Sequence, residues 1–168
     1  MTVPAGTRAA VVTASNRSAR GEREDTSGHL LADRLRELGC AVDSVTVVPD
    51  DVPAIQAALR AALAGGADLV ITTGGTGVTP TDVTPEATRP VLEREVPGIA
   101  EAIRLETRDK VPTSILSRGL AGTVGAALVV NLPGSRGGVK DAIAVLEPVL
   151  VHAVEQIAGS DHVRAEPG

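Results

Sequence analysis

The chain of 168 residues contains no phenylalanine, tryptophan or tyrosine, and its formal net charge at pH 7 is −5. Proteins that bind nucleic acid place basic side chains along the phosphates and stack bases on aromatic rings. The composition therefore argues against a nucleic-acid-binding protein. A flat ligand ring would have to lie against backbone, proline, aliphatic carbons or an arginine plane, because the chain has no aromatic side chain to stack on it.

The sequence is also poor in cysteine and in long apolar runs. Its one cysteine, Cys40, cannot form an internal disulfide, which fits the reducing cytoplasm. Cys40 follows Gly39 at the end of a predicted helix, and we interpret it as a small buried apolar side chain rather than a nucleophile. No run is long enough to span a membrane, and the N-terminus lacks the apolar stretch of a signal peptide. We expect a cytoplasmic protein without membrane contact.

What the sequence does contain is typical of one globular domain. Hydrophobic residues make up 43% of the chain, and a chain of this length can bury a core without disulfides or metals. We expect a single domain over residues 1–168, with flexible tails at residues 1–6 and 160–168.

Strand and helix patterns alternate along the chain. Short apolar or β-branched runs predict strands at residues 8–14, 42–48, 68–72, 120–124 and 126–132. Helical spacing of apolar residues predicts helices at residues 29–38, from 52 to the glycines at 65 and 66, from 84 until an interruption at 97–98, at 99–107 and at 139–157. Residues 15–28 are predicted as a loop, and 111–118 as a turn or short helix. Strands separated by helices form a mostly parallel sheet covered on both faces, so we predict an α/β fold, a three-layer α/β/α sandwich with one antiparallel pair formed by the last two strands.

Three helix starts carry capping signals. The segment Asp25-Thr26-Ser27 offers a cap for the first predicted helix, and Asp51 can cap the second, because a side-chain oxygen at this position accepts a hydrogen bond from the first turn. Thr84 is predicted as the cap of the next helix, with Pro85 at its first position.

Polar or glycine-rich clusters follow four of the predicted strands. Ser15-Asn16-Arg17 follows the first, Asp50 and Asp51 follow the second, a glycine-rich loop follows the third, and Asn131 to Arg136 lie at the end of the last. In open α/β sheets, ligands bind beyond the carboxyl ends of the strands. We therefore expect the four clusters to converge on one edge of the sheet and to form a binding site there.

The glycine-rich loop reads Thr73-Gly74-Gly75-Thr76-Gly77. Glycines allow positive φ and let backbone N–H groups approach an oxyanion, while threonine hydroxyls add donors. The loop has neither the lysine of a Walker motif nor the spacing of a dinucleotide fingerprint. It is predicted to bind a phosphorylated small molecule; the alternative is a tight turn without a ligand.

Two carboxylates lie near this loop, Asp50 at a strand end and Asp82 five residues past Gly77. A phosphate-binding loop does not tolerate carboxylates beside it unless a cation lies between them. Mg²⁺ held by one or two carboxylates and by substrate phosphates resolves this conflict. The pattern therefore indicates Mg²⁺–nucleotide chemistry, although exposed aspartates at such positions are more often caps or turn formers.

The last loop, Asn131-Leu132-Pro133-Gly134-Ser135-Arg136, combines a rigid turn with exposed amides and leads into a helix whose N-terminus favours anions. Arg17, Arg136 and Lys140 could contact phosphate, or could be solvated surface charges. The three histidines show no zinc-site spacing, and no Ser/His/Asp arrangement is recognisable. Metal-hydrolase and acyl-transfer chemistry are therefore disfavoured.

Taken in order, these motifs resemble the MogA/MoaB family of molybdenum-cofactor biosynthesis proteins, over about residues 8–157. The segments that carry the resemblance are Ser15-Asn16-Arg17, Asp25-Thr26-Ser27-Gly28, Pro49-Asp50-Asp51, Thr73-Gly74-Gly75-Thr76-Gly77, Asp82-Val83-Thr84-Pro85-Glu86-Ala87, Ser114-Ile115-Leu116-Ser117-Arg118 and Asn131-Leu132-Pro133-Gly134-Ser135. Many relatives carry Pro-Lys after the Gly-Ser of the last loop, where this chain has Arg136-Gly137. The cation that meets phosphate there is left open between Arg136 and Lys140.

The resemblance implies a molybdopterin adenylyltransferase, which converts molybdopterin and ATP into adenylyl-molybdopterin and pyrophosphate with Mg²⁺. It implies a homo-oligomer, usually a trimer and sometimes a hexamer, and a transient contact with the molybdate-inserting enzyme. The essential aspartates of the family match Asp50 and Asp82, which are expected to hold Mg²⁺. The resemblance also implies that the glycine loop holds the phosphate of the pterin rather than ATP. The candidate binding residues are Ser15, Thr73, Gly74, Gly75, Thr76, Gly77, Ser114, Ser117, Asn131, Pro133, Gly134, Ser135 and Arg136.

Two other functions remain open at this point. The chain could be a non-catalytic pterin-binding oligomer, a carrier or scaffold, although its retained Asp50 and Asp82 speak against this. It could also be a metal-insertion protein, because the same fold occurs in the larger molybdate-inserting enzymes, but those contain additional domains for which this chain has no room.

Overall fold

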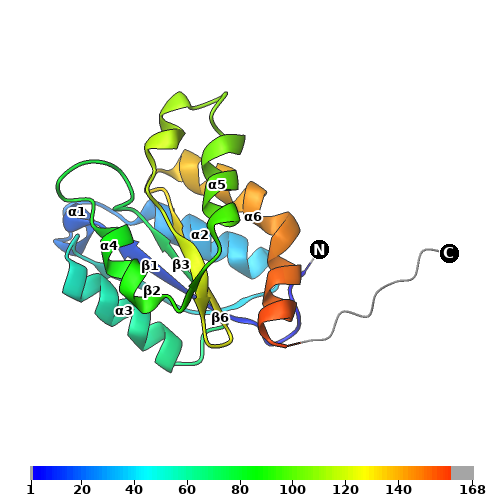
Figure 1. Cartoon of the computed structure of the whole chain (residues 1–168). Helices are drawn as coiled ribbons and strands as arrows, with labels where there is room; N and C mark the ends of the chain where they lie inside the picture. Colours follow the sequence, from blue (N-terminus) through cyan, green and yellow to red (C-terminus); the bar gives the residue numbers. More distant parts are fainter. Residues whose placement is uncertain (1, 160–168) are drawn as a thin grey trace.

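The computed structural model describes residues 2–159. Six strands form one mixed sheet in the order β2-β1-β3-β6-β5-β4 (Figure 1). The strands are β1 (Arg8–Ala14), β2 (Ala41–Val48), β3 (Leu69–Thr73), β4 (Arg94–Glu95), β5 (Ala121–Val124) and β6 (Ala127–Leu132). The helices are α1 (Asn16–Ala19), α2 (Thr26–Glu37), α3 (Val52–Ala64), α4 (Thr84–Thr88), α5 (Pro97–Glu106) and α6 (Arg136–Ile157), with 3₁₀ helices η1 (Arg89–Val91) and η2 (Pro112–Leu116).

The sheet is parallel from β2 through β1 and β3 to β6, and antiparallel from β6 to its other edge at β4. β1 pairs in parallel with β2 and β3, and β3 pairs in parallel with β6. β5 pairs antiparallel with β6, as predicted, and β4 adds a second antiparallel pair at the edge. The two-residue β4 was not predicted, because a segment this short carries no periodicity.

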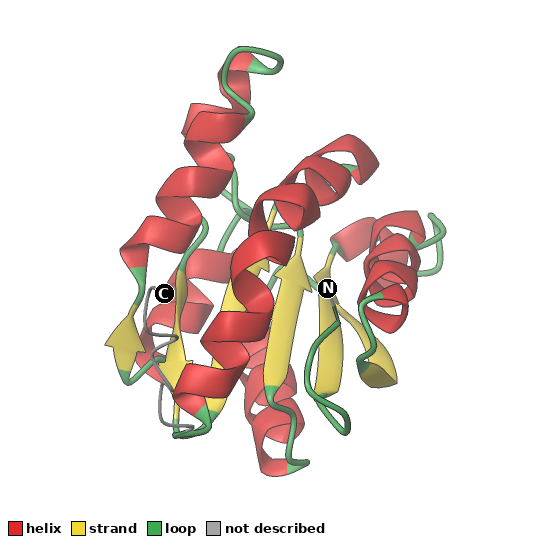
Figure 2. Ribbon diagram, turned by 90° about the vertical axis from the view of Figure 1, so that its right-hand side faces the viewer, coloured by secondary structure: helices red, strands yellow, loops and turns green. Residues whose placement is uncertain are grey.

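Helices cover both faces of the sheet, which confirms the predicted three-layer sandwich (Figure 2). On one face, α2, α5 and α6 pack over a cluster that includes Leu31, Leu35 and Leu146. On the other face, α3, α4 and η1 pack over a smaller cluster that includes Ile55, Leu59 and Val70. The central strand β3 is buried along its whole length, as expected for a parallel strand covered on both faces.

Polar side chains fix the start of three helices at the carboxyl edge of the sheet. Asp25 caps α2 by accepting from the N–H of Gly28 at 2.9 Å, and Asp51 caps α3 by accepting from Ala54 at 3.0 Å. Ser135 caps α6, which therefore begins three residues before the predicted position. Each such bond satisfies an amide that has no partner within its own helix.

Several local expectations were wrong. The predicted loop after β1 contains the single-turn helix α1, whose N–H groups are capped by Ser15. Thr84 is not the cap of α4, because its hydroxyl donates to the carbonyl of Gly74 at 2.9 Å instead. Pro97 does not interrupt a helix but begins α5, where a proline ring fits because the first turn needs no N–H donor.

Further expectations concern the single cysteine, the chain termini and the membrane. Cys40 is buried, as predicted, and burial raises the pKa of its thiol to about 11. Val3, which falls within the expected N-terminal tail, is only 6% exposed, and its N–H donates to Leu38 at 2.9 Å, so the chain is packed at this point. The expected tail at 160–168 lies outside the described residues. Among the helices that the structure describes, none has both the length and the apolar character needed to cross a bilayer.

Candidate active site

The clusters predicted at the strand ends do converge. The N–H of Ser15, just after β1, donates to the last carbonyl of β2, that of Val48, at 2.9 Å. The N–H of Gly74, just after β3, donates to Leu132 at the end of β6 at 3.2 Å. The parallel register of the four strands brings their carboxyl ends to one edge, so one edge carries all four clusters.

The glycine loop lies in close contact with the segments around it. Gly74 has φ +92°, and a Cβ added to it would lie 2.3 Å from the carbonyl oxygen of Ala14. Gly75 has φ +68°, and its Cβ would lie 2.3 Å from the hydroxyl of Thr84. Gly134 packs against this loop, since its own Cβ would lie 3.1 Å from Cα of Gly74. These glycines are required because larger residues would push apart the strand ends that form the site.

The hydroxyl of Thr73 is used within the protein. Thr73 is fully buried, and its Oγ1 donates to the carbonyl of Pro133 at 2.7 Å. This bond joins the glycine loop to the loop after β6. The hydroxyl that was predicted to donate to a ligand thus donates to a protein carbonyl. Thr76 and Gly77, by contrast, line the second of the two cavities described below.

Asp50 is held beside the glycine loop by reciprocal hydrogen bonds with Asn16. Oδ2 of Asp50 accepts from the N–H of Asn16 at 3.0 Å, and the N–H of Asp50 donates to Oδ1 of Asn16 at 2.9 Å. The other carboxylate oxygen, Oδ1, faces Gly75, 3.2 Å from where its Cβ would be. Burial raises the pKa of Asp50, and the charge of Asp82 raises it further, against the opposing effect of the Asn16 N–H.

Asp82 lies beside the same loop, next to Gly77. Its Oδ2 accepts from the N–H of Thr79 at 3.0 Å and from the Thr79 hydroxyl at 2.7 Å. The same oxygen lies 2.7 Å from the position of a Cβ on Gly77. Because Asp82 raises the pKa of Asp50, the two carboxylates lie within electrostatic reach of each other.

The donor set fits Mg²⁺ better than a softer metal. The described residues contain no group of three or more histidine, cysteine, aspartate or glutamate side chains that could hold a metal by themselves. Mg²⁺ is commonly bound by one or two carboxylates together with substrate phosphates and water. Asp50 and Asp82 would hold it, and a cation bound by both would offset the repulsion between their charges, which adds to burial in raising the pKa of Asp50.

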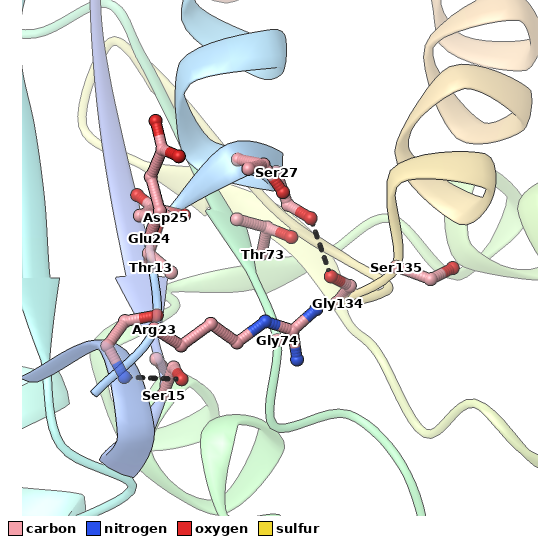
Figure 3. A pocket seen from close by; sticks show the side chains of 13 residues that line it. Thr13, Ser15, Arg23, Glu24, Asp25, Ser27, Thr73, Gly74, Gly134 and Ser135 are labelled. Atoms are coloured by element: carbon pink, nitrogen blue, oxygen red, sulfur yellow. Dashed lines mark hydrogen bonds between the residues drawn. The ribbon is translucent and has the colours of Figure 1, made fainter. Parts of the chain in front are cut away.

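A first cavity of about 290 Å³ opens between the glycine loop and the start of α2. Its wall is rich in hydroxyls, and Figure 3 shows Arg23 extending across it in the direction of Gly134. The hydroxyl of Ser27 donates to the carbonyl of Gly134 at 2.8 Å and closes one side. The residues that line it are Thr13, Ala14, Ser15, Ser18, Arg23, Glu24, Asp25, Thr26, Ser27, Thr73, Gly74, Gly134 and Ser135.

A second cavity of about 410 Å³ lies between the end of α5, η2, the loop after β6 and the start of α6. It brings the predicted residues Ser114 and Ser117 together with Gly77 and Pro133. The hydroxyl of Ser114 donates to the carbonyl of Arg104 at 2.8 Å, and Lys110 forms an ion pair with Asp141 at 2.8 Å on its rim. Ser135 lines both cavities, so the last loop separates them.

Asn131 was predicted as a binding residue, but the structure does not place its side chain in the site. It is 3% exposed, its Nδ2 donates to the hydroxyls of Thr72 and Thr88, and its Oδ1 accepts from the N–H of Leu120. Its side chain therefore joins β6 to its neighbours instead of facing the edge.

The cationic side chains also differ from the expected set. Arg136 is exposed in the first turn of α6 and, like Arg17 and Lys140, is not among the described residues that line the two cavities. Arg23 lines the first cavity, and Arg104 and Lys110 line the second. None of the three is part of a motif, so sequence reasoning could not separate them from other surface charges.

This architecture, a three-layer α/β/α domain with a glycine loop and two aspartates at the carboxyl edge, defines a class of ligand-binding α/β domain. A family model described as "Probable molybdopterin binding domain" matches residues 10–152. The chain belongs to this family, the MogA/MoaB family of molybdenum-cofactor biosynthesis proteins.

Individual relatives agree with this assignment. A protein of Pyrococcus furiosus named molybdopterin adenylyltransferase is 36% identical over 150 residues, which is 86% of this chain and 88% of that one. A crystal structure of a molybdopterin biosynthesis protein from Mycobacterium abscessus superposes with a TM-score of 0.87 at 50% identity, over 93% of this chain and 98% of that chain. A bifunctional molybdenum cofactor biosynthesis protein of Chlorobaculum tepidum is 36% identical over 92% of this chain, which spans only 50% of that longer protein.

Proposed function

We propose that this chain is a molybdopterin adenylyltransferase that uses Mg²⁺. The observation that carries the proposal is the position of two aspartates beside one glycine loop, with Asp50 next to Gly75 and Asp82 next to Gly77. The relative of that name, which matches over most of both chains, supports the same activity.

In the proposed reaction, an oxygen of the terminal phosphate of molybdopterin attacks the α-phosphorus of ATP. The bond from that phosphorus to the oxygen bridging to the β-phosphorus breaks, and pyrophosphate leaves with the bonding electron pair. The attacking phosphate is already ionised, so no general base is needed. Catalysis then consists of positioning the reactants and neutralising their charge.

The residues of the chain divide this work. We assign the attacking phosphate to the backbone amides of the loop from Gly74 to Gly77, where positive φ at Gly74 and Gly75 lets the chain turn tightly. Asp50 and Asp82 would hold Mg²⁺, which supplies charge neutralisation on the triphosphate when bound. The reciprocal bonds between Asn16 and Asp50 fix the direction of one carboxylate, and Thr79 fixes the other.

The test is pyrophosphate release from molybdopterin and ATP with and without Mg²⁺. Asp82→Ala should lower kcat by more than about 10²-fold, the loss that follows removal of one preorganised electrostatic contact to a transition state. Pterin binding should be retained, because the glycine loop is unchanged. Asp33→Ala is the matched control, since Asp33 is exposed on α2 and pairs only with Arg36 among the ion pairs described.

Two outcomes would count against the proposal. Full turnover by Asp82→Ala would exclude the role of this carboxylate. A wild-type protein that binds molybdopterin but releases no pyrophosphate would instead support the non-catalytic pterin-binding oligomer.

We also propose that the chain forms a homo-oligomer, a trimer in the first place and a hexamer as the alternative. The family supports this, and so do large apolar side chains exposed near the end of α5 and on η2, where Leu105 is 57%, Ile115 54% and Leu116 50% exposed. Light scattering with refractive-index detection suits a chain without aromatic residues. A strictly monomeric profile would contradict this part of the proposal.

A further inference from the structure

The loop that carries Asp82 is tied together internally but has few bonds of its own to the sheet. Inside it, Asp82 accepts two hydrogen bonds from Thr79, and the N–H of Asp82 donates to the carbonyl of Thr79 at 3.0 Å. Val78, in the same loop, is 64% exposed. These bonds set the shape of the loop, but they do not fix where the loop, and with it the carboxylate, lies relative to Asp50.

One residue from a distant segment makes that connection. The backbone N–H of Arg118 donates to the carbonyl of Thr76 at 2.8 Å, and its Nε donates to that of Gly77 at 2.8 Å. Its Nη2 donates to the carbonyl of Asp82, also at 2.8 Å. Arg118 thus holds the beginning and the end of the Asp82 loop at once.

The guanidinium is itself oriented by an acidic side chain. Glu86 on α4 forms an ion pair with Nη1 of Arg118, and this hydrogen bonding lowers the pKa of Glu86. The side chain of Arg118 is 36% exposed and that of Glu86 is 51% exposed, so the ion pair contributes little to the stability of the fold. Its effect is geometric, because it leaves the planar guanidinium with its Nε and Nη2 donors directed at the loop.

We propose that Arg118 is a positioning residue for Asp82. It acts through the backbone of the Asp82 loop and sets the distance between the two carboxylates, an inference that rests on the proposed function of Asp82. A lysine could not replace it, since one ammonium group has no planar fork to reach two carbonyls and a carboxylate together.

The first measurement needs no catalysis. Hydrogen exchange of the peptide that covers residues 76–83 should accelerate at least tenfold in Arg118→Ala, because the loop loses the two side-chain bonds to the carbonyls of Gly77 and Asp82. Arg89→Ala is the matched control, since Arg89 lies on η1 and forms a similar ion pair with Glu95. It should leave exchange in this peptide unchanged. Unchanged exchange in Arg118→Ala would overturn the proposal whether or not the protein is an adenylyltransferase.

The second measurement is kinetic. Arg118→Ala should lower kcat about 10²-fold, the loss typical of a displacement near 1 Å in a reacting group. The Mg²⁺ concentration needed for half-maximal rate should rise several-fold, while the KM for molybdopterin changes less than twofold. Arg118→Lys should remain close to Arg118→Ala, and added guanidinium should restore part of the activity of Arg118→Ala. A loss confined to the KM for molybdopterin would contradict the proposal.

A double-mutant cycle separates positioning from general damage. If Arg118 acts through Asp82, adding Arg118→Ala to Asp82→Ala should cause no further loss, because the carboxylate to be positioned is gone. Additive losses would show that Arg118 acts elsewhere and would overturn the proposal. If the wild-type protein itself releases no pyrophosphate, the proposed function fails, and the hydrogen-exchange result still decides the role of Arg118 in the loop.

Discussion

Replacing Asn131 should damage stability and leave ligand affinity intact. The family resemblance implies a binding residue, whereas the structure buries this side chain and pairs its amide with Thr72, Thr88 and the N–H of Leu120. Asn131→Ala removes three hydrogen bonds, each contributing about 1 kcal/mol, so it should destabilise the fold by about 3 kcal/mol. For a domain of this size, the thermal midpoint should fall by about 6–12 °C.

Thr123 on the neighbouring strand β5 provides the opposite case. Its side chain is 5% exposed, and among the described residues its hydroxyl has no hydrogen-bond partner. Thr123→Val keeps the shape and removes the buried unsatisfied hydroxyl, so it should stabilise the fold by about 1 kcal/mol. Two buried polar residues on adjacent strands thus have predicted effects of opposite sign.

The assay is thermal unfolding followed by far-ultraviolet circular dichroism, because the chain contains no tryptophan to report by fluorescence. Protein concentration must be held fixed, since any oligomer makes the midpoint concentration-dependent. The reasoning would be refuted if Asn131→Ala kept the wild-type midpoint and raised the KM for ATP, because the amide would then face the ligand and not the core.

Three further predictions follow from single sites. Gly74→Ala should lower the thermal midpoint strongly, because its Cβ would lie 2.3 Å from the carbonyl oxygen of Ala14 and its φ is +92°. Gly98→Ala should not lower it, because a Cβ there meets no atom within 4 Å. Equal midpoints for the two variants would show that the glycine loop has room for a side chain. Asp50→Asn should be more stable than wild type near neutral pH without Mg²⁺. Because the pKa of Asp50 is raised in the folded protein, the wild type loses stability as the pH rises from the ordinary aspartate pKa, about 4, to the folded pKa. The stability advantage of Asp50→Asn should therefore vanish at lower pH. Urea unfolding of both proteins as a function of pH tests this. Cys40 should resist alkylation in the folded protein at mildly alkaline pH and react in urea, since burial raises its pKa to about 11; rapid labelling of the folded chain would show that the thiol is accessible.

The general arrangement could be predicted from the sequence because it follows from rules that act locally or through topology. Asp25 and Asp51 were recognised as caps since a capping side chain acts within a few residues of its own helix. The convergence of the strand ends followed from the parallel order of the sheet, which needs no knowledge of any contact.

What could not be predicted depends on the direction of single side chains and on partners distant in sequence. Asn131 is the next-to-last residue of a strand beside the predicted site, and the burial of its side chain appears only when the sheet is covered on both faces. Thr84 is in a suitable sequence position for a helix cap, but its hydroxyl donates to the nearby carbonyl of Gly74 instead. Arg118 bonds carbonyls of a loop about forty residues away, and backbone acceptors leave no mark in the sequence.

The place of β2 in the sheet has a consequence for how the protein loses activity. Among the strands that the structure describes, β2 lies at the edge and pairs only with β1, whereas β3, which leads into the loop with Asp82, has strands on both sides. Edge elements open at lower free energy than central ones, and Asp50 lies two residues after the end of β2. Mild heat or denaturant should therefore separate Asp50 from Asp82 while the central strands remain intact. The protein should become inactive by partial opening before it unfolds, and cooling should restore it without refolding of the core.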